Sequence, residues 1–359
     1  MVRYRAAELA PWSEQLDGAH APWLPGYRVN IIDGHCIEAS DRRLKPLREV
    51  QGGALPGTSL VVYEPAYGLV RDVFPCEDGH AQERSLFGEV LRTVRAGDRW
   101  IAERNFCTRE FLGSVDTRGA VFIIRQHEGL PVEMLHAFCS VGRMETGHVA
   151  EQPVQVRAAQ GSPHLFRRIR VKLDQATRDG DRVLYILSTL PLHKASAKRI
   201  ARLYRTRWTL ETAFQHLEAY FHSEINTLAY PKAAWFGCCL ALVAYNMVAV
   251  VMAALRSVHG AETIDQELSR YYVANDLAQT YHGMMIALPE DEWRLFSRMR
   301  PVEMVATRRE LAQKVCLKAY RKSPRGPKKP RPKRGGIPKA SHVSTAKILR
   351  DRQVNAATP

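Results

Sequence analysis

The stretch LYRTRWTLETAF, residues 203–214, carries a phenol hydroxyl, a guanidinium and a carboxylate at Tyr204, Arg207 and Glu211. At about 100° per residue, these side chains lie on one side of a helix, at the edge of an apolar stripe. The stripe consists of Leu203, Leu210, Phe214, Leu217 and Phe221. One interpretation is an ordinary boundary of ion pairs, with Arg207 and Glu211 as an i,i+4 pair. The other is a cleft in which Glu211 joins further acids to bind a metal ion.

Two further acids follow apolar runs that are typical of buried strands. Asp33 closes the run VNII, and Glu103 closes the run RWIA. If both strands belong to one sheet, their carboxylates can converge with Glu211 on a helix packed against it. Carboxylate oxygens suit Mg²⁺, and two such ions activate a water and stabilise the leaving oxygen in attack on a phosphodiester. The sequence therefore predicts Asp33, Glu103 and Glu211 as catalytic acids and metal ligands.

The elements that must position these acids are indicated by alternating strand and helix patterns. The expected strands cover 28–33, 58–65, 67–75, 98–104 and 120–125, and the expected helices cover 81–94 and 108–115. We expect Asp78 to cap the first of these helices and Thr108 to cap the second. Glu64, before a proline, is expected at the surface. The order of elements predicts an α/β fold around one mixed sheet.

The pattern changes after this first part. Short strand-like runs predict an all-β insertion, after which helices return and continue almost to the C-terminal tail. The tail is rich in Pro, Gly and basic residues, and we expect it to be disordered. The predicted division has six parts. They are an N-terminal region (1–27), the first part of the catalytic core (28–125), the β insertion (126–192), the remaining core helices (193–260), a helical C-terminal region (261–317) and the tail (318–359).

The net charge of +15 and the isoelectric point near 9.7 favour an anionic partner. Of the possible anionic partners, nucleic acid is favoured over an acidic membrane surface. About ten of the Lys and Arg residues fall between 318 and 339, where they are suited to non-specific phosphate contact. The seven cysteines contain no Cys-x2-Cys pair, which argues against a structural zinc site and favours reduced thiols in the cytosol.

One segment, 235–255, is apolar over the length needed to span a membrane. It carries Tyr245 and Asn246 at its middle, which favours a buried core helix over a membrane span. We therefore expect no membrane partner.

These residues together resemble bacterial insertion-sequence transposases of the DDE type, in the insertion sequence four family. The family has a Tyr-x2-Arg-x3-Glu-x6-Lys signature, and Tyr204, Arg207 and Glu211 match its first three positions. VNIIDG and WIAERNFCT match the regions of the first two acids. The resemblance covers about 28–260. It implies a ribonuclease-H-like mixed sheet with an all-β insertion before the last catalytic helix, followed by a helical C-terminal part.

The resemblance also implies roles for the residues. Asp33, Glu103 and Glu211 would bind Mg²⁺ or Mn²⁺, and Tyr204 and Arg207 would contact phosphates near the transposon end. Trp208 could stack on an unpaired base or be an ordinary core aromatic. The implied activity is metal-dependent cleavage of double-stranded DNA at the element's ends and strand transfer to a target. The implied working unit is a homodimer on paired ends, located in the cytoplasm at the nucleoid.

The sequence departs from the family pattern at two positions. Glu103 stands where the family usually has Asp, and Glu218 stands at the position of the signature Lys. The candidate substitutes for that Lys are Arg205, His216 and Lys232. Because about thirty residues precede Asp33, the N-terminal region is also shorter than is usual in the family. These departures support an alternative, a truncated and catalytically decayed transposase remnant that only binds DNA.

Overall fold

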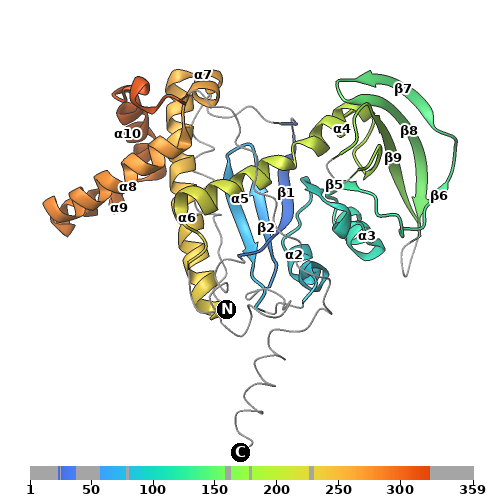
Figure 1. Ribbon diagram of the computed structural model, residues 1–359, viewed down its shortest axis with the longest axis horizontal. Helices are drawn as coiled ribbons and strands as arrows, with labels where there is room; N and C mark the ends of the chain where they lie inside the picture. Colours follow the sequence, from blue (N-terminus) through green and yellow to red (C-terminus); the bar gives the residue numbers. More distant parts are fainter. Residues whose placement is uncertain are drawn as a thin grey trace, which may run out of the picture.

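The computed structural model describes residues 23–24, 26–37, 57–77, 81–157, 163–177, 180–225 and 230–323. The expectations for Asp78, for most of the N-terminal region and for the tail beyond 323 lie outside these residues. Within them, one ten-stranded sheet runs in the order β3-β2-β1-β4-β5-β10-β9-β8-β6, and β7 pairs with β8. Helices lie on both faces of its first half, and a helical region adjoins its β3 end (Figure 1).

Two of the predicted acids belong to the half of the sheet formed by β1 to β5: Asp33 lies in β1, and Glu103 directly follows β4. The bounds of these strands are Arg28–His35, Ser59–Glu64, Leu69–Phe74, Asp98–Ala102 and Val121–Arg125. Strands β1, β2 and β3 pair antiparallel, whereas β4 runs parallel to β1 and β5 runs parallel to β4. Helices cover both faces, so these strands read as continuous apolar runs rather than as alternating ones. The mixed sheet is consistent with a ribonuclease-H-like domain.

The expectation that Glu64 lies at the surface was wrong. Its side chain is only 3% exposed, and it pairs with Arg28 of β1 at 3.1 Å. A buried carboxylate is stable when a cation and hydrogen bonds compensate its lost hydration. The run before Pro65 therefore continues the sheet interior rather than leaving it.

One face of β1 to β5 packs against two short helices, α2 (Phe87–Leu91) and α3 (Arg109–Thr117). The Thr108 hydroxyl accepts a hydrogen bond from the Phe111 amide at 3.2 Å, which confirms the predicted cap. The helix expected at 81–94 is shorter. It consists of a 3-10 turn, η3 (Glu83–Leu86), and α2, and the cap position of η3 is Gln82, whose side chain makes no capping bond. A second 3-10 turn, η4 (Arg104–Phe106), follows β4.

The residues between 126 and 192 contribute five strands and, where the structure describes them, no helix. These strands are β6 (Glu133–Met134), β7 (Cys139–Met144), β8 (Gly147–Val156), β9 (His164–Leu173) and β10 (Val183–Ser188). They do not form a separate sheet. β10 pairs antiparallel with β5, so the strands extend the core sheet into a strongly curved wing (Figure 1).

The other face of the sheet packs against α4 (Ala197–Arg205) and α5 (Trp208–Phe221). The predicted apolar stripe packs in this core: Leu203, Leu210 and Leu217 are buried, and Phe214 and Phe221 pack against it partly buried. The two helices follow each other almost without interruption. At their junction the Thr206 and Arg207 amides bond to carbonyls three residues back, at Leu203 and Tyr204, which is the tighter 3-10 pattern. The signature therefore spans a junction between two helices.

The long apolar segment forms α6 (Pro231–His259), which is long and apolar enough to cross a membrane but is mostly buried inside the protein. Asn246 at its middle is fully buried. Its side chain accepts from the Val70 amide at 2.9 Å and donates to the Val70 carbonyl at 2.7 Å. Val70 lies on β3, the end strand of the sheet. The helix thus covers the edge of the sheet and satisfies backbone groups there that have no partner strand.

The C-terminal helices are α7 (Ala261–Glu267), α8 (Arg270–Ala287), α9 (Glu290–Arg298) and α10 (Pro301–Gln313), followed by the 3-10 turn η5 (Leu317–Tyr320). Of these, α7, α8 and α10 pack around the second half of α6. Apolar residues of α6, α7, α8 and α10 form a separate core cluster there. No disulfide joins any of the seven cysteines, all of which lie in the described ranges.

Candidate active site

Arg207 contacts all three predicted acids. Its Nη1 donates to Asp33 Oδ2, its Nε lies 3.4 Å from Glu103 Oε2, and its Nη2 lies 2.9 Å from Glu211 Oε1. The guanidinium side chain is only 11% exposed. Burial lowers its pKa, but the carboxylates outweigh this effect and raise the pKa above the ordinary arginine value. Three carboxylates from separate parts of the chain therefore converge on one cation.

The sheet and the helix junction explain this convergence. β1 and β4 are parallel neighbours, and Ile32 pairs with Ala102, so the next residue of each strand is an acid at the same level. Glu103 follows β4 directly, whereas Asp33 lies within β1, which continues to His35. The junction between α4 and α5 lies above these two acids and directs Arg207 towards them. Glu211 follows one turn later on α5.

Asp33 is largely shielded from solvent, with 19% of its side chain exposed. Burial raises its pKa to about 6, although the Arg207 charge and the Gly34 amide, which donates to Oδ1 at 3.0 Å, both lower it. Glu83 of η3 adds a further negative charge nearby. A side chain at position 34 would collide with the Glu83 carboxylate, so the glycine leaves room for this fourth acid. Asn105 holds Glu83 with a hydrogen bond of 3.1 Å.

Glu103 is held by two donors besides Arg207. The Tyr204 hydroxyl donates to its Oε2 at 2.8 Å, and Arg125 Nη1 lies 3.5 Å from its Oε1. Arg125 also pairs with Asp181 at 2.6 Å. Burial, together with the Glu103 charge, raises the pKa of Tyr204 well above its usual range, so the phenol stays a donor. The longer glutamate side chain thus has a partner for each carboxylate oxygen.

The side chains of the site that are exposed to solvent lie at the start of α5. The Glu211 side chain is 48% exposed, and Trp208 is 54% exposed. The alternative that Trp208 is a core aromatic was therefore wrong. The indole lies at a cavity of about 460 Å³, which is also lined by Tyr204, Arg205 and residues of β9 and β10. Of the cations considered as substitutes for the signature Lys, Arg205 is the one at this cavity.

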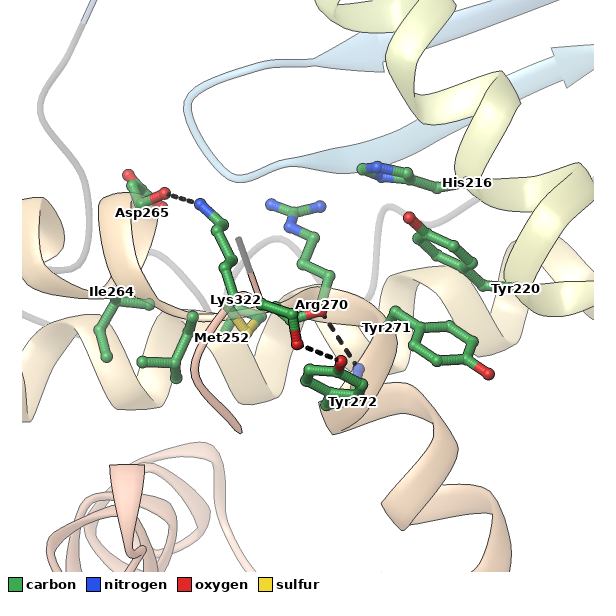
Figure 2. A pocket seen from close by; sticks show the side chains of 12 residues that line it. His216, Tyr220, Met252, Ile264, Asp265, Arg270, Tyr271, Tyr272 and Lys322 are labelled. Carbon is green, nitrogen blue, oxygen red and sulfur yellow. Dashed lines mark hydrogen bonds between the residues drawn. The ribbon is translucent and has the colours of Figure 1, made fainter. Parts of the chain in front are cut away.

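A different cavity is lined by His216 and by the aromatic residues Tyr220, Tyr271 and Tyr272. Figure 2 shows this space of about 750 Å³ between α5, α7 and α8, with Arg270 rising between Lys322 and the His216 ring. Burial, and then the Arg270 charge, lower the pKa of His216 to about 4. Its ring stacks on Tyr220 at 4.8 Å. A neutral histidine in this position cannot replace the positive charge of the signature Lys.

The donor set at the acids agrees with Mg²⁺ or Mn²⁺ in kind, because all its atoms are carboxylate oxygens. The positive charge that these oxygens meet in the structure belongs to Arg207. Within the described ranges, no three His, Cys, Asp or Glu side chains are spaced as a finished metal site. Metal binding by Asp33, Glu103 and Glu211 therefore stays a prediction.

The sequence did not point to Arg125 or Glu83 as parts of this site. Arg125 is the last residue of an apolar strand that runs parallel to the strand ending before Glu103. This position at a strand end was the one feature of the sequence that could have indicated a place beside Glu103. Glu83 lies in a segment predicted as ordinary helix. Its place beside Gly34 depends on the 3-10 turn, which the pattern of apolar residues did not reveal.

Similarity to known proteins covers the part of the chain that carries the three acids. The family model described as the transposase DDE domain matches residues 24–247, a range that includes all three acids. The transposase of insertion sequence element IS421 from Escherichia coli is 23% identical over 246 residues, which cover 58% of this chain and 62% of that protein. The InsL protein of element IS186A from Escherichia coli K12 matches to the same extent. The chain thus spans about three fifths of the length of these relatives. Because the family model covers more than half of the chain, the protein belongs to the transposase DDE domain family.

Proposed function

We propose that this chain is a DNA transposase of the insertion sequence four type, which cuts DNA at the ends of an insertion sequence and transfers the cut strand to a target. The observation that carries the proposal is the convergence of Asp33, Glu103 and Glu211 on Arg207. Such a cluster of acids lowers the stability of a protein unless a cation compensates their charge. The membership of the chain in the DDE family supports a catalytic role for these acids. Double-stranded DNA is the proposed substrate, and the net charge of +15 agrees with it.

In this proposal Asp33, Glu103 and Glu211 hold the divalent ions. Bound Mg²⁺ or Mn²⁺ would supply an activated water and would neutralise the leaving oxygen. The surrounding residues orient the acids. Tyr204 and Arg125 fix the two oxygens of Glu103, and the Gly34 amide fixes Asp33. These contacts give the glutamate a defined position, so we infer that Glu103 is the working second acid.

Tyr204 and Arg207 would contact DNA phosphates only after releasing their present partners, because both are buried and bonded to the acids. We infer that their first role is to position the acids. Trp208 is differently placed. Its exposed ring beside Arg205 suits an unpaired base, since stacking on an aromatic ring stabilises a base by ~1–3 kcal/mol.

The strands β6 to β10 are proposed to be the β insertion of the family. We also propose a homodimer on paired ends, and a cytoplasmic location at the nucleoid. The alternative, a decayed remnant that only binds DNA, is less well supported because all three acids remain and converge. The test is cleavage of DNA that carries the element's ends, in the presence of Mg²⁺ or Mn²⁺. Cleavage that is lost in Glu211→Ala supports the enzyme, whereas salt-dependent binding without cleavage supports the remnant.

A further inference from the structure

A row of cations with interleaved aromatic rings lies on the β wing, away from the acids. Arg168, Arg170 and Lys172 are alternate residues of β9, so they point to the same face of the sheet. The rings of Phe138 and Tyr185 lie between them. Arg168 lies over the Tyr185 ring at 4.2 Å, and Arg170 lies over the Phe138 ring at 4.3 Å. We call these five residues the arginine ladder.

The ladder lies on a face that no described helix covers. Helix α4 packs against the opposite face of this wing, where Ile169 and Val171 are buried in the core. On the ladder's own face, Phe166 is buried in the core cluster that includes residues of α3. Beyond Phe166, Arg168 and Arg170 are half-buried and Lys172 is exposed. The apolar pattern of the strand therefore stops where the cations begin.

The positive charge of the ladder is not neutralised within the described part of the chain. None of the ion pairs there involves Arg168, Arg170 or Lys172. Arg168 donates to the neutral side chain of Gln126 at 2.7 Å. Its pKa is lowered by burial and by the charge of Arg170, although Tyr185 raises it. Two guanidinium groups held close together without an acid favour the approach of an external anion.

The ladder suits a nucleic-acid backbone because it is a regular row of cations. Alternate residues of a strand are about 6.7 Å apart, and one DNA strand carries one phosphate charge per ~3.4 Å of helix axis. The stacked rings fix the guanidinium planes, which reduces the entropy lost when they bond phosphate oxygens. The hydrogen-bond partner of the ladder, Gln126, directly follows Arg125, which contacts Glu103. Successive side chains of a strand point to opposite faces, so the ladder and the acids lie on opposite faces of the sheet.

We propose that the arginine ladder is a sequence-independent binding surface for the phosphate backbone of duplex DNA. The proposal rests on the proposed function, because it takes DNA to be the substrate. The ladder contributes affinity for DNA rather than sequence specificity. Each cation is expected to neutralise one phosphate.

The test is the salt dependence of DNA binding, measured by fluorescence anisotropy with EDTA present so that no cleavage occurs. The variant is Arg170→Gln with Lys172→Gln, which leaves the Arg168–Gln126 bond intact. The slope of log K against log salt is negative, and each lost phosphate contact makes it less steep by about 0.9. The slope of the double variant should therefore be less steep than that of the wild type by about 1.8, equally on element ends and on unrelated duplexes. The matched control is Arg298→Gln with Lys314→Gln, which removes two exposed charges from the C-terminal helices. It should keep the wild-type slope.

The outcomes separate this inference from the proposed function. If the wild type binds DNA and the ladder variant keeps its slope, the ladder inference is overturned and the transposase proposal stands. An equal loss in the control variant also overturns it, because net charge alone would explain the effect. Loss of binding to phosphatidylserine vesicles with an unchanged DNA slope would assign the surface to an anionic membrane instead. A wild type that binds no DNA at low salt would overturn both proposals. Circular dichroism checks that both variants fold.

Discussion

The guanidinium of Arg207 bonds the carboxylate of Asp33 across 174 residues of sequence, and it bonds Glu211 within its own turn of helix. One side chain therefore joins the first and last acids of the candidate site. This arrangement gives Arg207 a structural role that a residue reaching out to DNA would not have. It also couples the position of α5 to the position of β1.

Arg207→Gln should strongly destabilise the protein. Removing one partner of a buried ion pair leaves an uncompensated charge, which typically costs ~3–5 kcal/mol. Urea unfolding at pH 7 measures the loss. Arg205→Gln is the matched control, because Arg205 is exposed on the same turn, and it should change stability by less than ~0.5 kcal/mol. A loss in Arg207→Gln as small as in the control would show that the three contacts are not maintained in solution.

Divalent metal should stabilise the Arg207→Gln variant more than it stabilises the wild type. Without the guanidinium, the acids have no shared cation, so a bound ion relieves more repulsion. A ligand present at 100 times its Kd adds about 2.7 kcal/mol to the free energy of unfolding. Thermal unfolding with Mn²⁺, and again after EDTA, measures this difference. An equal response in both proteins would argue against metal binding at these acids.

Tyr204→Phe should lower stability through Glu103 alone. The phenol donates its hydrogen bond to this carboxylate, and a bond to a charged group contributes ~1.5–3 kcal/mol. A double-mutant cycle with Glu103→Gln measures the coupling by urea unfolding. We expect a coupling free energy above ~0.5 kcal/mol, as for residues in contact. Additive losses would mean that Tyr204 stabilises the protein by packing only.

Asn246→Leu should be costly although it makes α6 more apolar. The change leaves the Val70 amide and carbonyl without their side-chain partner in a buried place. Each unsatisfied group costs ~1–3 kcal/mol, so the free energy of unfolding should fall by ~2–5 kcal/mol. Met247→Leu, at the exposed neighbour, is the control. If Asn246→Leu stabilised the protein, α6 would not lie against the sheet edge as described.

Stability should fall as the pH drops from about 6.5 to about 4, in part because of His216. Its pKa is lowered from 6.5 to about 4 by burial and by Arg270, so only the unfolded chain binds a proton between these values. The stabilisation is complete above pH 6.5 and is lost as the pH falls through the folded pKa. At about 1.4 kcal/mol per pKa unit, the difference between 6.5 and about 4 corresponds to about 3.5 kcal/mol, and solvent screening of the partly exposed ring reduces it to about 2 kcal/mol. His216→Gln should flatten this part of the pH profile of urea unfolding. An unchanged profile would exclude His216 as its source.

The sequence was sufficient for those parts of the site that depend on local pattern. Glu103 could be predicted directly after a strand because buried parallel strands appear as apolar runs, and Glu211 could be placed beside Arg207 by helical spacing. Thr108 could be assigned as a cap for the same reason. In each case the signal lies within a few residues of the position it predicts. Asp33 was expected to close its strand, but β1 continues for two more residues to His35.

The remaining features depend on register between distant segments. The Asn246–Val70 bonds join residues 176 positions apart, and Arg125 meets Glu103 only because β4 and β5 align. Composition does not specify either alignment. The burial of Glu64 was missed for the same reason, since its partner Arg28 lies on another strand. The arginine ladder likewise requires knowledge of which face of β9 remains uncovered.

The most direct test of the account is strand cleavage of a supercoiled plasmid that carries the element's own ends, with Mg²⁺ or Mn²⁺. The proteins compared are the wild type, Glu103→Asp and Glu211→Gln, each checked for folding by circular dichroism. The account predicts nicking by the wild type, loss of nicking in Glu211→Gln, and weaker nicking in Glu103→Asp, because the shorter side chain loses its contacts with Tyr204 and Arg125. Cleavage by Glu103→Asp alone would contradict the assignment of Glu103 as the working acid. DNA binding without cleavage by any of the three would contradict the catalytic assignment as a whole.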